Sequence, residues 1–263
     1  MRPEAPIGVY DSGLGGLSVW RALRQQLPGE SLAYLGDGKH CPYGSRPKEE
    51  IARLADQAVA YLVGLGCKLV VVACNTATAA AIEPLRAKYS MLSLVGMEPA
   101  VKPACLNTRS GVVGVLATER SLDGELFRRT AARYGEHIEV VTAPGAGFVE
   151  LVEQSREHTP EAEERVRAVV EPMLARGVDQ IVLGCTHYPF LEEVIRRVIG
   201  GRDVALIDPA PAVARRVEHL LREQDLLAPA DSPVELTFHT FAEQEYRERI
   251  ARKAQEVDPW REK

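Results

Sequence analysis

Two short apolar runs that each end in a cysteine place the strongest constraint on the fold of this chain. Residues 70–76 have the sequence VVVACNT, and residues 181–187 have the sequence IVLGCTH. Runs of β-branched and aliphatic residues of this length are typical of strands in the middle of a parallel sheet, where both faces are covered. Ligands of open α/β sheets bind beyond the carboxyl ends of the strands, so both cysteines are predicted to lie at ligand sites.

The rest of the chain alternates between strand-like and helix-like segments in both halves, which predicts an α/β fold with two similar lobes. Strands are expected near residues 7–10, 32–35, 70–72, 92–95, 112–116, 138–142, 181–184, 204–207 and 234–240. Helices are expected near residues 17–27, 48–63, 77–89, 122–134, from 148, 161–176, 212–222 and at the carboxyl end. The loop at 36–47 is long and rich in glycine and proline, and such loops tend to be functional.

The composition argues against several classes of partner. The 263 residues include 32 Lys and Arg against 37 Asp and Glu, a net charge of −5, and no basic run indicates a nucleic-acid partner. No apolar run approaches the ~20 residues that span a bilayer, and the amino terminus carries no signal-like segment. We therefore expect a cytoplasmic protein with neither a nucleic-acid nor a membrane partner.

The five cysteines form an odd set without a Cys-x-x-Cys pair, which argues against a disulfide framework and against a zinc ribbon. Cys67 and Cys105 are predicted to be small buried hydrophobic residues. Cys74 and Cys185 differ, because each ends a strand, and a thiolate at the start of a helix is stabilised by the helix dipole and the backbone N–H groups. Such a thiolate could be a nucleophile, a metal ligand or a base.

Two cysteines in equivalent places favour proton exchange on opposite faces of one carbon. Inversion of an amino-acid α-carbon without a cofactor needs two such groups, since a single base would return the proton to the same face. A thiol can serve in either protonation state near neutral pH at small cost. Groups suited to holding a small acid lie nearby in the sequence: Ser12, Asn75, Thr76, Thr186, the glycine loop 13–16 and Tyr43-Gly44.

Several motifs of the chain, taken in order, resemble those of the cofactor-independent glutamate racemases. They are Asp11-Ser12-Gly13-Leu14-Gly15-Gly16, Cys41-Pro42-Tyr43-Gly44, Ala73-Cys74-Asn75-Thr76-Ala77, Glu98-Pro99 and Gly184-Cys185-Thr186-His187-Tyr188-Pro189. The resemblance covers roughly residues 7 to 210 and implies interconversion of L- and D-glutamate, without a cofactor or a metal, to supply D-glutamate for peptidoglycan. Glutamate is the expected partner, and a homodimer is the expected assembly.

The resemblance also implies roles for individual residues. Cys74 and Cys185 would be the acid–base pair, with Asp11 beside Cys74, and with Glu153 and His187 beside Cys185, as residues that take or relay protons. Glutamate binding is implied for Asp11, Ser12, Tyr43, Gly44, Asn75, Thr76, Thr186 and His187. The chain departs from the family at Arg120-Ser121, where Gly-Thr is common.

The family has two α/β lobes with mainly parallel sheets flanked by helices, and its active site lies in the cleft between them. Its carboxyl-terminal segment returns to the first lobe. Residues 1–97 with 207–263 are therefore expected to form the first lobe, which carries Cys74, and residues 98–206 the second lobe, which carries Cys185.

Other interpretations stay open on sequence alone. A racemase for aspartate would use the same paired thiols, although His187 favours glutamate. A metal-dependent hydrolase could use Cys74, Cys185 and His187 as ligands, but a catalytic zinc needs three ligands that converge on one point. A regulatory protein could bind an amino acid without exchanging its proton. Asp11 could also be a helix N-cap, and Glu153 a solvated charge.

Overall fold

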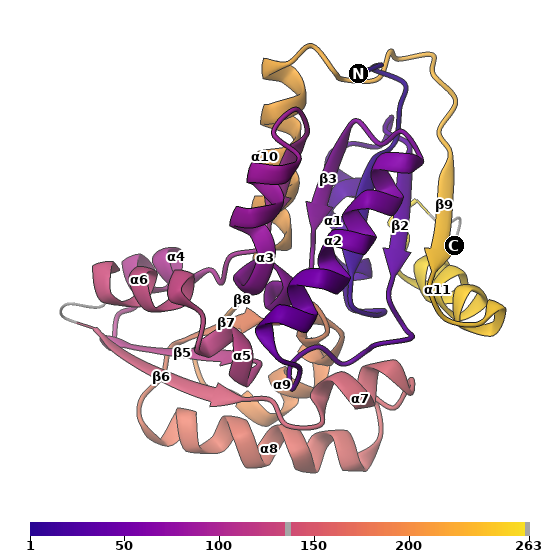
Figure 1. Cartoon of the computed structure of the whole chain (residues 1–263). Helices are drawn as coiled ribbons and strands as arrows, with labels where there is room; N and C mark the ends of the chain where they lie inside the picture. Colours follow the sequence, from indigo (N-terminus) through magenta and orange to yellow (C-terminus); the bar gives the residue numbers. More distant parts are fainter. Residues whose placement is uncertain (135–137, 261–263) are drawn as a thin grey trace. The chain divides into compact units, whose positions relative to one another are not determined.

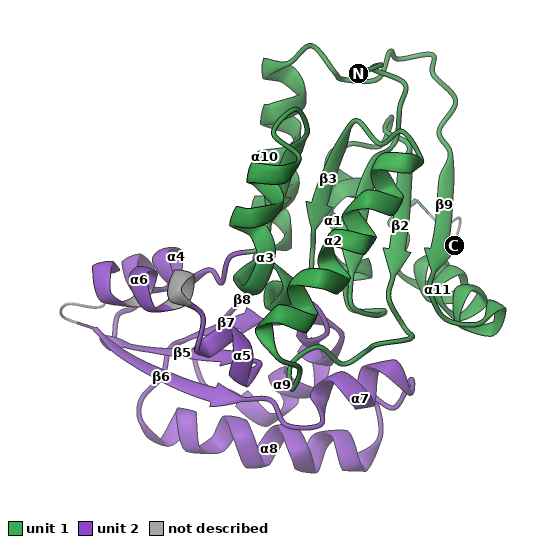
Figure 2. Cartoon of the chain, in the orientation of Figure 1, with its two compact units in different colours: residues 1–97, 210–263 green, residues 98–209 purple. Residues whose placement is uncertain are grey.

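The strands form two separate parallel sheets in the computed structural model, which describes residues 1–134 and 138–260 (Figure 1). Each sheet belongs to one of two units (Figure 2). Unit 1 consists of residues 1–97 and 210–263, and unit 2 consists of residues 98–209. Unit 2 is thus inserted in the sequence between the two segments of unit 1.

Unit 1 holds a five-stranded sheet in the order β4-β3-β1-β2-β9. Its strands are β1 (Ile7–Asp11), β2 (Leu32–Gly36), β3 (Leu69–Val72), β4 (Ser93–Gly96) and β9 (Leu236–Thr240). Its helices are α1 (Leu17–Gln26), α2 (Lys48–Gly64), α3 (Asn75–Lys88), α10 (Ala210–Glu223) and α11 (Gln244–Val257).

Unit 2 holds a four-stranded sheet in the order β6-β5-β7-β8. Its strands are β5 (Val112–Ala117), β6 (Glu139–Pro144), β7 (Gln180–Gly184) and β8 (Ala205–Ile207). Its helices are α4 (Val101–Asn107), α5 (Glu119–Leu122), α6 (Glu125–Tyr134), α7 (Phe148–Glu153), α8 (Pro160–Ala175), the 3-10 helix η1 (Tyr188–Leu191) and α9 (Glu192–Ile199).

The two sheets share one strand order, because β4-β3-β1-β2 in unit 1 corresponds to β8-β7-β5-β6 in unit 2. Every strand pair in both sheets is parallel. The predicted α/β fold with two similar lobes is therefore confirmed. The strands that precede the two cysteines, β3 and β7, occupy the same place in their sheets.

Alternate side chains along the strands of unit 1 point to the same face of its sheet and form a hydrophobic core there. Tyr10, Leu35 and Val72 are fully buried and pack with residues of α2 and α3, which cover this face in Figure 1. Gly8 lets α2 approach, since a Cβ at this position would lie 3.1 Å from the Leu62 side chain. On the other side, α1 packs against α10 and α11.

In unit 2 both faces of the sheet are buried, as the apolar run at 181–184 predicts. Ile181 and Leu183 point into a cluster with residues of α7, α8 and α9. Val182 points the other way and packs with residues of α4 and β5. Within the described residues, no helix is long and apolar enough to cross a membrane.

Some elements differ from their expected bounds. The helix expected at 122–134 begins only at Glu125, as α6. The residues before it form the separate short helix α5, which Thr118 caps and which had not been expected. The helices α4 and α9 and the 3-10 helix η1 had not been expected either. Strand β8 includes Ile207, which pairs with Val182, so unit 2 extends past the expected boundary at residue 206.

Candidate functional site

The strand order of unit 1 reverses between β1 and β3, which lie side by side. The chain continues from β1 to β2 on one side and from β3 to β4 on the other. Ligands of doubly wound sheets bind at such a switch point, beyond the carboxyl ends of the two strands. Asp11 is the last residue of β1, and Cys74 follows β3 closely; the Ala73 N–H donates to the Tyr10 carbonyl at 2.8 Å, so these two strand ends stay together.

Cys74 is the N-cap of α3, and its side chain is buried with 4% exposure. The Cys74 Sγ accepts a hydrogen bond from the Ala77 N–H at 3.4 Å. The thiol also donates to the Ser12 Oγ at 3.6 Å. A helix N-terminus favours negative charge, so this position stabilises a thiolate at Cys74.

Asp11 is fully buried at the start of the glycine loop. Its Oδ2 accepts a hydrogen bond from the Gly13 N–H at 3.0 Å. The N-cap of α1 is Gly16, so the interpretation of Asp11 as the cap of this helix is wrong. Gly16 is needed for packing instead, since a Cβ there would lie 2.5 Å from the Asp11 Cβ.

Asn75 and Thr76 form the first turn of α3, and each is 4% exposed. Neither the Nδ2 nor the Oδ1 of Asn75 has a hydrogen-bond partner within residues 1–134 and 138–260. Buried amides are nearly always hydrogen-bonded in folded proteins, so an amide without partners indicates a place where a ligand or water binds. Asn75 therefore marks the switch point of unit 1 as a polar binding site.

Tyr43 is buried in the core of unit 1, and the adjacent Gly44 is partly exposed. The Tyr43 hydroxyl donates to the Asp37 Oδ2 at 2.6 Å and accepts from the Tyr10 hydroxyl at 2.9 Å. Burial raises the pKa of both tyrosines, with a further contribution from Cys74 at Tyr10, so both hydroxyls stay protonated. The sequence had not identified Tyr10 or Asp37, because nothing in the sequence around them indicates this contact.

Unit 2 has its switch point between β5 and β7. Cys185 follows β7 directly and is 7% exposed. The loop after β5 contributes the Thr118 and Ser121 hydroxyls, which lie 2.8 Å apart, and Ser121 is buried. No motif in the sequence indicates a role for Thr118, although its position after β5 matches that of Ser12 after β1.

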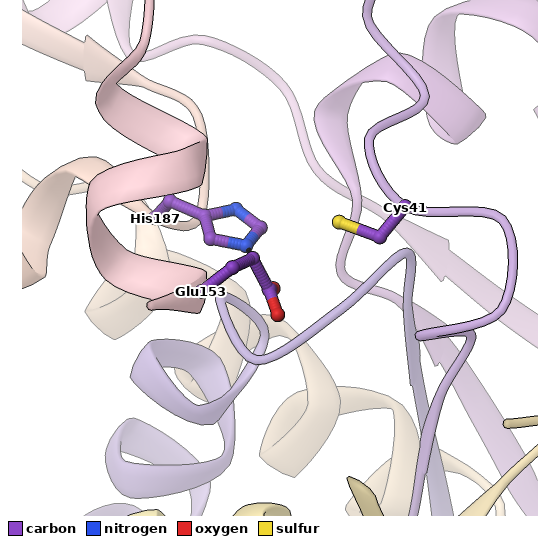
Figure 3. Close-up of side chains that lie close together, drawn as sticks. All are labelled: Cys41, Glu153 and His187. Carbon is purple, nitrogen blue, oxygen red and sulfur yellow. Dashed lines mark hydrogen bonds and ion pairs between the residues drawn. The ribbon is translucent and has the colours of Figure 1, made fainter. Parts of the chain in front are cut away.

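His187 lies between Cys185 and the Glu153 carboxylate of unit 2. Figure 3 shows the side chains of His187 and Glu153 next to each other. The His187 Nε2 lies 2.7 Å from the Glu153 Oε1, and the His187 Nδ1 lies 3.8 Å from the Cys185 Sγ. The Thr186 Oγ1 lies 3.5 Å from the same Nδ1. His187 is 1% exposed, and the Glu153 side chain is 15% exposed.

This geometry suits proton transfer at Cys185. A carboxylate that accepts the Nε2–H of a histidine leaves Nδ1 as the acceptor, and it stabilises the imidazolium once Nδ1 takes a proton. The interpretation of Glu153 as a solvated surface charge does not fit its short contact with the buried His187.

The two cysteines are supported in different ways. Cys74 caps an α-helix, whereas Cys185 is followed by the 3-10 helix η1 and has the His187–Glu153 pair instead. Cys67 and Cys105 are buried, as predicted, and burial raises the pKa of Cys67 to about 12. Cys67 is therefore a poor source of thiolate near neutral pH.

The chain is similar to known proteins over most of its length. Residues 7–217 match the model of the Asp/Glu/Hydantoin racemase family. The glutamate racemase of Roseiflexus sp. (strain RS-1) is 48% identical over 222 residues, which cover 84% of this chain and 81% of the relative. The glutamate racemase of Herpetosiphon aurantiacus is 48% identical over 229 residues, which cover 87% and 89%.

Solved structures agree with this similarity. The Escherichia coli glutamate racemase, in complex with L-glutamate and the activator UDP-MurNAc-ala, matches with a TM-score of 0.84 at 30% identity, over 97% of this chain and 96% of that chain. The Francisella tularensis glutamate racemase, in complex with D-glutamate, matches with a TM-score of 0.83 at 27% identity, over 98% and 96%.

Proposed function

The chain belongs to the Asp/Glu/Hydantoin racemase family, and we propose that it is a glutamate racemase that interconverts L- and D-glutamate through two cysteines. The observation that carries this proposal is the equivalence of Cys74 and Cys185. Each thiol is buried and follows the corresponding strand of one of two sheets with the same strand order. The solved relatives that hold L- or D-glutamate support the choice of substrate.

The reaction exchanges one proton. One cysteine, as the thiolate, removes the proton from the α-carbon, and the electron pair of the C–H bond stays on that carbon. The other cysteine, as the thiol, gives a proton to the opposite face. The product leaves with inverted configuration, and each cysteine ends in the protonation state in which the other began. The reverse reaction therefore runs through the same two groups.

Different neighbours would assist the two thiols. At Cys74, the N-terminus of α3 favours the thiolate, the Ser12 hydroxyl accepts a hydrogen bond from the thiol form, and Asp11 lies at the neighbouring strand end. At Cys185, the His187 Nδ1 would take the thiol proton while Glu153 stabilises the resulting imidazolium.

Neutral donors at the two switch points would make most of the contacts with glutamate. The Asn75 amide, which is buried without a partner among the described residues, is the strongest candidate. The other proposed binding residues are Asp11, Ser12, Tyr43, Gly44, Thr76, Thr186 and His187. No cofactor and no metal are needed for this reaction, since both proton transfers use cysteine side chains.

The role in the cell follows from the product. D-glutamate would serve peptidoglycan synthesis in the cytoplasm, and we propose that the enzyme acts there as a homodimer. Light scattering of the purified protein would test the assembly, and a monomeric mass at micromolar concentration would contradict it.

Proton NMR in D2O tests the function directly. Purified protein without added cofactor is expected to remove the α-proton signal of L-glutamate and of D-glutamate, while the other enantiomer appears. Exchange of aspartate but not of glutamate would make the chain a racemase with another substrate. Absence of exchange with both amino acids would refute the paired-thiol mechanism.

Cys74→Ser and Cys185→Ser test the two bases separately. Each variant should bind glutamate but lose racemisation by orders of magnitude, because a hydroxyl is a far weaker base than a thiol. Cys67→Ala, in the same core, is the matched control and should keep its activity. Turnover of either serine variant close to that of the unmodified protein would contradict the assignment.

A further inference from the structure

The loop that connects β2 to α2, residues 37–47, is fixed by a buried carboxylate that the proposed function does not use. Asp37 follows the last residue of β2 and is fully buried. Its backbone N–H donates to the Asp11 carbonyl at 3.0 Å, so Asp37 is tied to the end of β1 at the switch point. A buried carboxylate needs hydrogen-bond donors around it, and two side chains of the same loop provide them.

The first donor is Tyr43, whose hydroxyl lies 2.6 Å from the Asp37 Oδ2. The Tyr43 oxygen in turn accepts from the Tyr10 hydroxyl at 2.9 Å. A directed chain of hydrogen bonds therefore runs from Tyr10 on β1 through Tyr43 to Asp37. All three side chains are at most 1% exposed, so a lost bond cannot be replaced by bulk water.

The second donor is His40, whose Nδ1 lies 2.9 Å from the Asp37 carboxylate. Two hydrogen bonds from Arg46 also fix the backbone of the loop. The Arg46 Nε donates to the His40 carbonyl at 2.7 Å, and the Arg46 backbone N–H donates to the Tyr43 carbonyl at 3.0 Å. Asp37 is thus the centre of contacts that reach both sides of the loop around Tyr43 and Gly44.

We propose that Asp37 is a positioning residue, which holds the Tyr43-Gly44 segment in the conformation that binds the substrate. This inference rests on the proposed function, in which Tyr43 and Gly44 contact glutamate. A carboxylate suits the task because it accepts from Tyr43 and His40 at once and offers no competing donor. Asp37 itself takes no part in proton exchange.

Three variants of the full-length protein test this role by racemisation kinetics with L- and D-glutamate. Asp37→Ala removes both acceptor oxygens and is expected to raise KM for both enantiomers about tenfold or more, with kcat within about threefold of the unmodified value. Asp37→Asn keeps an acceptor for the Tyr43 hydroxyl and should bring KM back to within about threefold. Tyr43→Phe keeps the buried ring, removes the donor and should raise KM as Asp37→Ala does.

The matched control lies at the other end of the same strand. The Glu30 Oε2 forms a buried ion pair with the Lys68 Nζ at 2.5 Å, just before β2 begins. Glu30→Gln should lower the unfolding temperature and leave KM unchanged, which separates a loss of stability from a loss of positioning. If Asp37→Ala does not fold, Tyr43→Phe and Asp37→Asn still give the comparison of KM values.

The outcomes distinguish this inference from the proposed function. If the unmodified protein does not racemise glutamate, the proposed function fails, and this inference fails with it. If the unmodified protein is active but Tyr43→Phe and Asp37→Ala keep its KM, the positioning role alone is overturned. A loss of kcat without a rise in KM, or equal defects in Asp37→Asn and Asp37→Ala, would also overturn it.

Discussion

Replacement of Glu153 by glutamine isolates the charge of the His187–Glu153 pair from its geometry. The Glu153 Oε1 lies 2.7 Å from the His187 Nε2, and a glutamine can keep an acceptor oxygen at the same place. The substitution therefore removes the negative charge that stabilises the imidazolium when His187 holds the Cys185 proton. Folding should change little, because the Glu153 side chain is partly exposed.

The magnitude follows from the difference between two kinds of hydrogen bond. A bond to a charged group contributes about 1.5–3 kcal/mol, against about 0.5–1.5 kcal/mol for a neutral pair. The loss of about 1–2 kcal/mol in the transition state corresponds to a fall in kcat/KM of roughly 5- to 30-fold. Glu153→Ala removes the acceptor as well and should cost roughly 10- to 150-fold.

Circular dichroism of glutamate gives the rates in both directions. The two enantiomers have equal free energy in water, so kcat/KM must fall by the same factor from either side. The deuterium isotope effect on proton removal need not be equal for the two enantiomers, because His187 assists Cys185 and not Cys74. It should increase for the enantiomer whose α-proton Cys185 removes, since that step becomes slower.

Glu150→Gln is the matched control, because Glu150 lies on the same helix α7 and is exposed. It should keep the activity of the unmodified protein. The reasoning would be refuted if Glu153→Gln kept kcat/KM within about twofold, or if Glu150→Gln lost as much activity as Glu153→Gln.

Three further predictions concern binding and stability. Asn75→Ala should raise KM for glutamate about tenfold or more. The unfolding temperature should not fall, because the buried amide has no hydrogen-bond partner among the described residues; a clear loss of stability would contradict this. Lys68→Met leaves the buried Glu30 carboxylate without its ion-pair partner and should lower the free energy of unfolding, measured in urea, by about 3–5 kcal/mol. The double variant Lys68→Met/Glu30→Gln should lose less, because it has no unpaired charge; an equal loss would contradict this cause. Burial acts to raise the pKa of Asp179, but hydrogen bonds from Thr108 and two backbone N–H groups outweigh it and lower the pKa. The unmodified protein should therefore be more stable than Asp179→Asn by about 1–3 kcal/mol in the free energy of unfolding above pH ~4, and this difference should disappear as the pH falls below that value. A difference that grew toward low pH would contradict the lowered pKa of Asp179.

The sequence predicted the sheets well, because their central strands leave a strong pattern. The run before Cys74 is fully buried in β3, and the run before Cys185 is fully buried in β7. Their short length and their content of β-branched residues were enough to distinguish these strands from helices. Short helices were harder: α4 has 7 residues and contains Pro103, and α9 has 8 residues close behind Pro189.

Contacts within loops could not be predicted from the sequence. The length of the segment at 36–47 indicated a functional loop, but periodicity carries no information on how an irregular chain folds back. The contact of Asp37 with Tyr43 depends on the path of that chain, and His40 had been given no role. The pairing of Glu153 with His187 was expected only through the resemblance to a family, since the two residues lie far apart in the sequence.

The insertion of unit 2 into unit 1 has a consequence for synthesis on the ribosome. Residues 1–97 emerge first and contain β1 to β4, but β9, which pairs with β2, emerges only after all of unit 2. During this interval, roughly 10 to 30 s at ordinary elongation rates, one edge of β2 has no neighbouring strand. The helices that pack against α1 also come late, since α10 is made shortly before β9 and α11 after it. Unpaired strand edges promote aggregation, so we expect the nascent chain to need protection by chaperones until β9 has been made and has paired with β2.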